Sequence, residues 1–408
     1  VTVSYRERNY EPKTVQRYHF QILPLSRCCF IKFGENMKDN SAFSTVMGFA
    51  MLLVILTAAY AYFQIEYIPE ICSSYETKHF SEVIDELVEL SAKVKDSITN
   101  DEPSSVSIKL GSNYPDVPFF STPPGFTGML RSYDAEVRIQ NAVGVEGEVA
   151  QVWDGSEVVW TGQSLKYTPN YIFSSGHEAV WEYGIVAVGK LNYVSVDGKI
   201  IEGKTIFIPL LRANISDSSN ARKEYTLSVY SGGGKGILIR DNGNPIKIIL
   251  KTSLPRSFWE NHWSEVIDQS YVSSVAYNNG VVEITLRTGT TYRLIAGVIE
   301  IEESSGRAAQ HYLYRLSPSN QTVPATLVVE VRDKFNNPVP NVDVTFRSSS
   351  ITFSDGVHTG NTLTVKSDYR GIASVVAVDV SGSSGIAVAS ITREDGTPFE
   401  IAFTLWKG

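Results

Sequence analysis

The strongest constraint on this chain is an uncharged apolar run at residues 42–63, AFSTVMGFAMLLVILTAAYAYF. As a helix, with about 1.5 Å of rise per residue, the run would span roughly 33 Å, close to the thickness of the bilayer's hydrocarbon core. Its polar members, Ser44, Thr45 and Thr57, carry hydroxyls that can bond to carbonyls of the same helix. We therefore expect a membrane helix rather than a buried helix of a soluble domain. The alternative is a removed secretory signal, since AAYA near the end weakly matches a signal-peptidase site.

Charges on either side of the run predict its orientation. Residues 1–40 carry seven Lys or Arg and four Asp or Glu, whereas Glu66 and Glu70 follow the run and the first cation after it is Lys78. Positive charge flanks the cytoplasmic end of a membrane helix. We expect a single-pass protein of the cell membrane, with the bilayer as a partner, the N-terminus in the cytoplasm and the C-terminal domains outside.

The residues ahead of the run have two interpretations. Residues 1–36 show no helical or strand period, and Met37 opens a short charged lead, MKDNS, directly before the run. We expect the native start at Met37, which makes residues 1–36 a non-native leader. The alternative is a cytoplasmic leader with reactive thiols at Cys28 and Cys29.

Residues 37–63 then form a signal or transmembrane helix, and SAFSTVMGFAMLLVILTAAYAYFQ resembles the N-terminus of archaeal type IV pilin-like proteins. The resemblance implies that a prepilin peptidase cuts between Ala42 and Phe43, and that copies of the chain associate through this helix. That family has Lys or Arg just before the small residue at the cut, where this chain has Asn40 and Ser41. An uncleaved anchor and a processed filament subunit both stay open.

A helical stem is expected at residues 64–100. Its apolar residues recur at steps of three and four, which places them on one face of a helix: Phe80, Val83, Ile84, Leu87, Leu90, Val94 and Ile98. Either the chain's own β domain or a neighbouring copy, as in a coiled coil, would cover this stripe. Pro69 predicts a kink or break in the helix, and TNDEP at 99–103 predicts its end.

Residues 104–316 predict a sandwich-like domain of antiparallel β-strands, because short alternating segments follow one another without a regular helix between them. Asp-Gly pairs at 154–155 and 197–198 predict hairpins, and Asn-Gly at 279–280 with Thr-Gly at 288–289 predicts a three-stranded meander. One helix is expected within SFWENHWSEVIDQ. Two segments of this region, SLKYTPNYIFSSGHEAVWEYG and LKTSLPRSFWENHW, resemble an uncharacterised family of archaeal membrane-anchored surface proteins.

After a polar linker, SPSNQTVP, residues 325–408 resemble an immunoglobulin-like domain of the invasin and intimin type. The resemblance rests on VRDKFNNPVPNVDVTF, with a loop at 336–340, and on SDYRGIASV, read as a hairpin in which Gly371 permits the turn. It implies a β-sandwich that acts as a rigid spacer. Trp406 is expected to pack inside it. The overall fold class is therefore mainly β, with one N-terminal helix.

Few features of the sequence suggest chemistry. SGGGKG at 231–236 lacks the Ser or Thr that follows the lysine of a phosphate-binding loop, and His177 with Glu178 and His262 with Glu265 lack metal-site spacing. We expect no cofactor, no metal and no enzymatic activity. Asn214 and Asn320 fit the N-glycosylation pattern.

Composition excludes two further classes. The net charge of −8 argues against a nucleic-acid partner, which requires a basic face. Only Cys28, Cys29 and Cys72 are present, so neither a disulfide framework nor a cysteine zinc site supports the bulk of the chain.

These observations favour a membrane-anchored cell-surface structural or adhesion protein. An extracellular module for envelope glycan or another cell surface is the alternative, because Trp153, Trp160 and Trp181 could stack on sugar rings or fill the β core.

Overall fold

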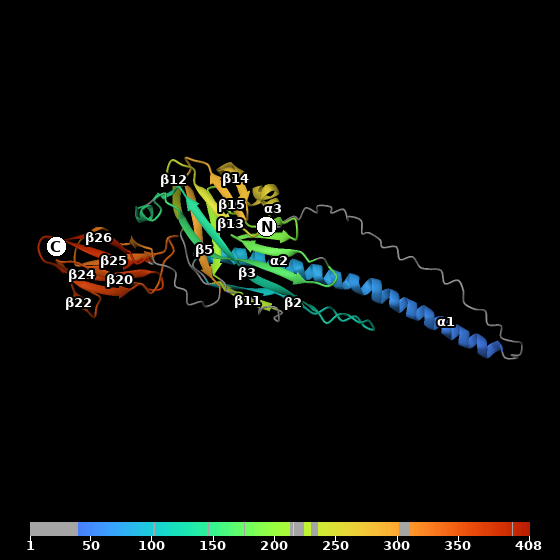
Figure 1. The fold of residues 1–408 in the computed structure, drawn as a ribbon. Coiled ribbons are helices and arrows are strands. Elements are labelled where there is room, and N and C mark those ends of the chain that lie inside the picture. Colours follow the sequence, from blue (N-terminus) through green and yellow to red (C-terminus); the bar gives the residue numbers. More distant parts are fainter. Residues whose placement is uncertain are drawn as a thin grey trace. The chain divides into compact units, whose positions relative to one another are not determined.

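The computed structural model describes residues 40–100, 103–145, 147–174, 176–212, 215, 224–229, 236–301, 311–393 and 395–408. The chain divides into two compact units, residues 1–61 and 62–408. The first unit contains most of helix α1 (Asn40–Tyr62), and the second contains all of the sheets. The predicted fold class, mainly β with one long N-terminal helical segment, is confirmed (Figure 1).

A π-helical turn, η1 (Phe63–Tyr67), joins α1 to α2 (Ile68–Asn100). The Ile68 N–H bonds to the carbonyl oxygen of Phe63, five residues back. This wider turn makes room directly before Pro69, whose ring has no N–H and crowds the carbonyl four residues earlier. Of the predicted kink or break at Pro69, the break is wrong, because the helix continues through this residue, and the irregularity takes the form of the π-helical turn before it. The predicted end at 99–103 is confirmed, since α2 stops at Asn100.

The β domain is built on one branched sheet of fourteen strands, whose main path runs β14-β15-β13-β3-β5-β10-β16-β12-β4. A separate two-stranded sheet pairs β1 (Ser104–Lys109) with β11 (Glu224–Val229). The strands of the large sheet are β2 (Gly111–Ser112), β3 (Phe126–Gln140), β4 (Ala142–Gly144), β5 (Val158–Asn170), β6 (Glu178–Glu182), β7 (Ile185–Gly189), β8 (Val194–Asp197), β9 (Ile201–Glu202), β10 (Thr205–Arg212), β12 (Ile237–Asp241), β13 (Lys247–Lys251), β14 (Val272–Asn278), β15 (Val281–Leu286) and β16 (Tyr292–Glu300).

Local turn signals predicted some pairings and missed others. The Asn279–Gly280 hairpin between β14 and β15 is confirmed, and both turn residues have positive φ, 45° and 77°. The meander is wrong, because β16 leaves β15 and runs parallel to β10. The expectation of purely antiparallel pairing in residues 104–316 fails at this pair.

Both predicted Asp-Gly hairpins are also wrong. The segment before Gly155 forms a 3₁₀ helix, η2 (Gly147–Gln151), instead of a strand. The strand before Gly198, β8, pairs with β7, whereas β9 pairs with β10. The predicted helix is present as two short helices, α3 (Arg256–Asn261) and α4 (Trp263–Val266), followed by a 3₁₀ turn, η4 (Gln269–Tyr271).

The C-terminal residues form two five-stranded sheets, β17-β19-β24-β21-β22 and β18-β26-β25-β20-β23, with a shared apolar core. Their strands are β17 (Tyr312–Arg315), β18 (Asn320–Val323), β19 (Ala325–Arg332), β20 (Asp343–Arg347), β21 (Ile351–Ser354), β22 (Thr359–Gly360), β23 (Thr362–Lys366), β24 (Ile372–Val380), β25 (Ser384–Thr392) and β26 (Pro398–Lys407). Because β17 and β18 pair with β19 and β26, the segment predicted as a linker belongs to the sandwich.

Gly371 occupies a turn that joins the two sheets of the sandwich. Its φ is +74°, and a Cβ there would lie 2.8 Å from the carbonyl oxygen of Val331, so a side chain would meet both strain and a clash. The predicted hairpin is wrong, however, because β23 and β24 belong to different sheets. The predicted loop at 336–340 is confirmed between β19 and β20.

Candidate anchoring site

The side chains of α1 from Ser44 to Tyr62 are exposed to solvent in the structure. The Thr57 hydroxyl donates to the carbonyl oxygens of Leu53 (2.9 Å) and Val54 (3.0 Å), so its polarity is satisfied within the helix, as predicted. Among the described residues, one helix, Ser44–Thr99, is long and apolar enough by length and composition to cross a membrane, and its apolar window has no buried residue. The apolar surface of α1 has no protein cover within the described chain.

The stem helix α2 lies on the chain's own β domain. It contacts β1 and β11 of the small sheet and β6, β7 and β16 of the large sheet. Five members of the predicted stripe are fully buried there: Val83, Leu87, Leu90, Val94 and Ile98. The expectation that the chain's own domain covers the stripe is confirmed. Each such side chain contributes roughly 1.5–3 kcal/mol when buried, so the stem is held firmly.

Polar contacts fix the position of the stem within this apolar interface with the β domain. The Trp181 indole N–H, from β6, donates to the Ser91 hydroxyl of α2 at 2.7 Å, and both side chains are buried. The Ser91 hydroxyl in turn donates to the carbonyl oxygen of Gly184 at 3.3 Å. These bonds link one turn of the helix to the tight turn between β6 and β7.

A buried carboxylate, Glu76, holds the loop that follows β5. It accepts hydrogen bonds from the backbone N–H groups of Ile172 (2.8 Å), Phe173 and Ser174 (2.6 Å), and from the Tyr114 hydroxyl. Burial alone would raise the pKa of Glu76, but these hydrogen bonds outweigh it and the pKa lies below its usual value. The carboxylate therefore stays ionised and holds two loops against the stem.

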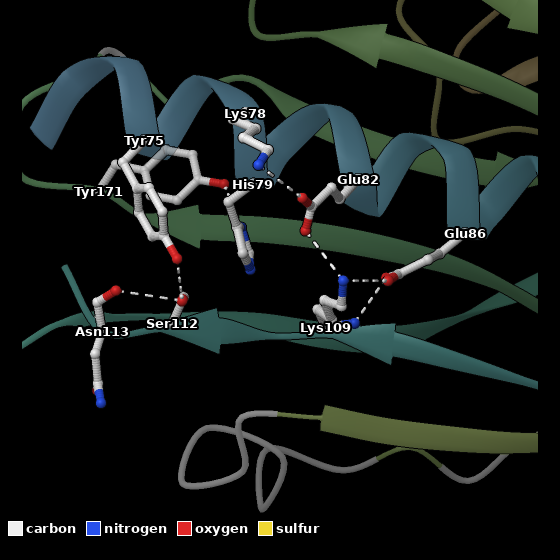
Figure 2. A network of polar contacts seen from close by, with 9 residues as sticks. All are labelled: Tyr75, Lys78, His79, Glu82, Glu86, Lys109, Ser112, Asn113 and Tyr171. Carbon is white, nitrogen blue, oxygen red and sulfur yellow. Dashed lines mark hydrogen bonds and ion pairs between the residues drawn. The ribbon is translucent and has the colours of Figure 1, made fainter. Parts of the chain in front are cut away.

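Figure 2 shows the neighbouring contacts on the same stretch of α2. The His79 ring Nδ1 lies 2.9 Å from the Tyr171 hydroxyl, and its Nε2 is buried without a partner among the described residues. Burial lowers the pKa of His79, with Lys109 adding to the effect and Glu82 opposing it. A neutral imidazole thus packs beside the Glu76 clamp.

Lys109 at the end of β1 bridges two carboxylates of the stem (Figure 2). Its Nζ lies 3.1 Å from Glu82 and 3.9 Å from Glu86, while its backbone N–H donates to Glu86 at 2.7 Å. The hydrogen bond from Lys109 is the largest cause that lowers the pKa of Glu82. The Lys109 side chain is half exposed, so this bridge aligns β1 with the helix more than it adds stability.

A second junction joins the β domain to the first loop of the C-terminal sandwich. The Trp153 indole N–H donates to the carbonyl oxygen of Lys334 at 2.8 Å, and the Trp160 and Phe335 rings pack edge to face with centroids 4.8 Å apart. Asp333 supports this loop by accepting the backbone N–H groups of Phe335 and Asn337. Burial raises the pKa of Asp333 to about 6.

Most sequence-predicted site residues lie outside the described residues or away from these junctions. Ala42 and Phe43 lie in α1, but their side chains are outside the described residues, as are Asn214 and residues 231–235 of the glycine-rich segment. Asn320 is exposed at the start of β18. His262 bonds to Glu265 at 3.1 Å. Among the described residues, no group of three or more His, Cys, Asp or Glu could hold a metal ion.

The tryptophans require two corrections. Trp153, Trp160 and Trp181 are buried in the β domain, so none of them presents a face to a sugar. Trp406, expected to pack inside the sandwich, lies on β26 with 49% of its surface exposed. It follows Leu405, which is fully buried, and alternation along the strand places Trp406 on the outer face.

Comparisons with known proteins give distant similarities. No protein-family model and no curated protein matches the chain. Among solved structures, the adhesin InvE of Yersinia pseudotuberculosis is 14% identical, with a TM-score of 0.20, over 44% of this chain and 54% of its own. The D0-D1 domain of intimin is 12% identical, with a TM-score of 0.18, over 60% of this chain and 90% of its own. The chain thus spans about half the length of the InvE structure.

A third structure has a similarly low score. A superoxide reductase from Ignicoccus hospitalis is 14% identical, with a TM-score of 0.16, over 25% of this chain. At such scores the similarities carry no argument about activity.

Proposed function

We propose that this protein is a membrane-anchored structural or adhesion protein of the cell surface that presents its β domains outside the cell. One observation carries the proposal: the uncovered apolar surface of α1 is followed directly by a stem whose own apolar face is buried in the β domain. This order of elements suits a membrane anchor followed by a folded head, with the C-terminal sandwich as a spacer. This role is non-enzymatic and needs no cofactor.

Flanking charge supports the proposed sidedness, with the N-terminus in the cytoplasm. The test is labelling of intact cells with a membrane-impermeant thiol reagent, using the full chain with one cysteine at the exposed position Val357 or with the natural Cys28 and Cys29. We expect labelling at position 357 alone. Labelling at residues 28 and 29 but not at 357 would overturn the orientation.

A processed subunit of a type IV pilus-like filament is the second candidate. It is favoured by the contrast along the helical segment, since α1 is uncovered while five of the seven stripe residues of α2 are buried in the chain's own β domain. Copies would then associate through α1. Intact mass of the native product distinguishes the two: a filament subunit begins at Phe43 and is recovered in sheared filaments, whereas the anchor retains the residues before Ala42.

Recognition of envelope glycan receives less support than the sequence suggested, because the three tryptophans that motivated it are buried.

A further inference from the structure

Exposed apolar side chains of the second unit are found at the end of the apolar run and in two loops that contact the helical segment after it. Phe119 is 94% exposed and Ile172 is 60% exposed, each in its own loop, and Tyr62, Ile65 and Tyr67 are exposed on the adjoining helix. We call these five residues the apolar collar. Soluble proteins rarely gather large exposed apolar side chains in one place unless something binds there.

The loop that carries Phe119 is fixed to the residue that directly follows the run. The Gln64 side-chain amide donates to the carbonyl oxygen of Ser121 at 2.7 Å and accepts from its N–H at 3.3 Å. Phe63 packs against Phe120 with ring centroids 5.6 Å apart. The loop therefore lies where α1 ends, whatever direction α1 takes beyond that point.

The second loop is held by the stem helix itself. Its backbone at Ile172, Phe173 and Ser174 is held by Glu76, and Phe173 packs in a small cluster with Ile68 and Tyr114. The first loop is thus braced at Gln64, directly after the apolar run, and the second at Ile68 and Glu76 of α2, farther along the same helical segment. Hydrogen bonds and aromatic packing thus fix the position of both loops of the collar.

The conformation of Phe119 gives a second argument. The Phe120 N–H bonds to the carbonyl oxygen of Val117, which closes a turn with Pro118 second and Phe119 third, and the φ of Phe119 is +69°. Gly or Asn is favoured at such a position. A bulky aromatic residue there costs free energy in the turn and exposes its ring to water, and no contact among the described residues offsets either cost.

Charge indicates the chemistry of the partner. Residues 117–130 contain no Asp, Glu, Lys or Arg, and Glu66, Glu70 and Asp116, the charged groups closest in sequence to the helix exit and to Phe119, are acidic and exposed. The charged groups closest in sequence to Ile172, Lys166 and Glu178, form an ion pair with each other. An apolar surface whose nearby cation is paired with a carboxylate suits a lipid layer entered through its acyl chains, not one bound through anionic headgroups. Aromatic side chains are favoured at this depth.

We propose that the apolar collar inserts into the headgroup–acyl boundary of the membrane that holds α1, so that the β domain rests on the bilayer instead of swinging freely above it. This inference rests on the proposed anchoring. Insertion at three points, the helix exit and two loops, would fix the tilt of the stem and hence the direction in which the head is presented.

The test uses the full chain in phosphatidylcholine vesicles, with Cys28 and Cys29 replaced by Ser and a single new cysteine carrying an environment-sensitive fluorophore. Cys72 can remain, because it is buried and burial raises the pKa of its thiol, which keeps it unreactive. Labels at Phe119 and, as a second reporter, Ile172 are compared with a label at Val54 in α1 and one at Val357, which is 85% exposed on the C-terminal sandwich. Vesicles contain lipids with a quencher either near the headgroup or deep in the acyl chain.

We expect the labels at 119 and 172 to shift to the blue and to lose intensity with the shallow quencher, the label at 54 to respond to the deep quencher, and the label at 357 to respond to neither. If position 54 is quenched while 119 and 172 behave like 357, the collar proposal fails and the anchor stands. If position 54 is not quenched, the anchor itself fails. Shielding at 119 and 172 that appears only at high protein concentration, without lipid quenching, would assign the collar to a second copy and overturn the proposal.

Discussion

The Trp181 indole N–H and the Ser91 hydroxyl form a 2.7 Å hydrogen bond in the buried contact between stem helix and β domain. It is one of several polar contacts that set where along its length the helix meets the sheet. An apolar stripe alone would not determine that position. The same helix offers a matched comparison, because the hydroxyl of Ser97 is buried without a partner among the described residues.

Ser91→Ala should lower the free energy of unfolding by about 1–3 kcal/mol, since it leaves the Trp181 N–H buried and unpaired. Ser97→Ala should be neutral or stabilising, because it removes a hydroxyl that makes no bond. Chemical denaturation of the full chain in detergent measures both. Equal losses in the two variants would show that the Trp181–Ser91 bond has no special role.

Glu76→Gln should weaken the clamp on residues 172–174 by about 2 kcal/mol, because a neutral amide accepts these hydrogen bonds less strongly than a carboxylate. Hydrogen exchange at Ile172, Phe173 and Ser174 should rise with the loss. The control is Glu89→Gln, at an exposed position of the same helix, which should stay within about 0.5 kcal/mol of the natural chain. Unchanged exchange in Glu76→Gln would contradict the clamp.

Acid should weaken the packing of α2 against the β domain, because His79 becomes protonated. Its pKa is lowered in the folded state, so the folded protein favours the neutral ring, and this contribution is lost as the pH falls below about 6.5. Stability measured from pH 7.5 down to 5.0 should therefore fall more steeply in the natural chain than in His79→Gln. Identical slopes would mean that the ring does not titrate in this range. Glu76, with its lowered pKa, should lose its own contribution only below about pH 4.5.

The hydrogen bond between Trp153 and Lys334, at the junction with the C-terminal sandwich, can be tested by replacing either of two tryptophans with phenylalanine. Trp153→Phe removes the donor to Lys334 and leaves a carbonyl oxygen unpaired, whereas Trp160→Phe removes an indole N–H that has no partner among the described residues. Both replace a buried tryptophan by phenylalanine, so the Trp153 variant should lose about 1 kcal/mol more. The opposite order, in denaturation of the full chain, would contradict the role of the hydrogen bond.

Sequence patterns predicted the elements of the fold that depend on residues close together in the sequence. The uncharged run, the stripe from Val83 to Ile98 and the Asn279–Gly280 turn each reflect a local pattern, and each was found. The position of β16 was missed because no local signal states that a strand beyond a Thr-Gly turn will join β10 instead of β15. Strand partners are chosen by packing across the whole sheet.

The polar site was missed for a related reason. Glu76 meets Tyr114 and residues 172–174 only after the stem lies on the sheet, and its neighbours in sequence give no sign of a buried carboxylate. The collar had one visible signal, the uncharged stretch at residues 117–130, but without helical or strand period it could not be placed beside Gln64.

The most direct test of the central claim is alkaline extraction of membranes from cells that produce the full chain. If α1 spans the bilayer, the chain stays in the membrane pellet through the alkaline wash and is released only by detergent. Recovery of the natural chain in the alkaline supernatant, with its β domains still folded, would contradict the account.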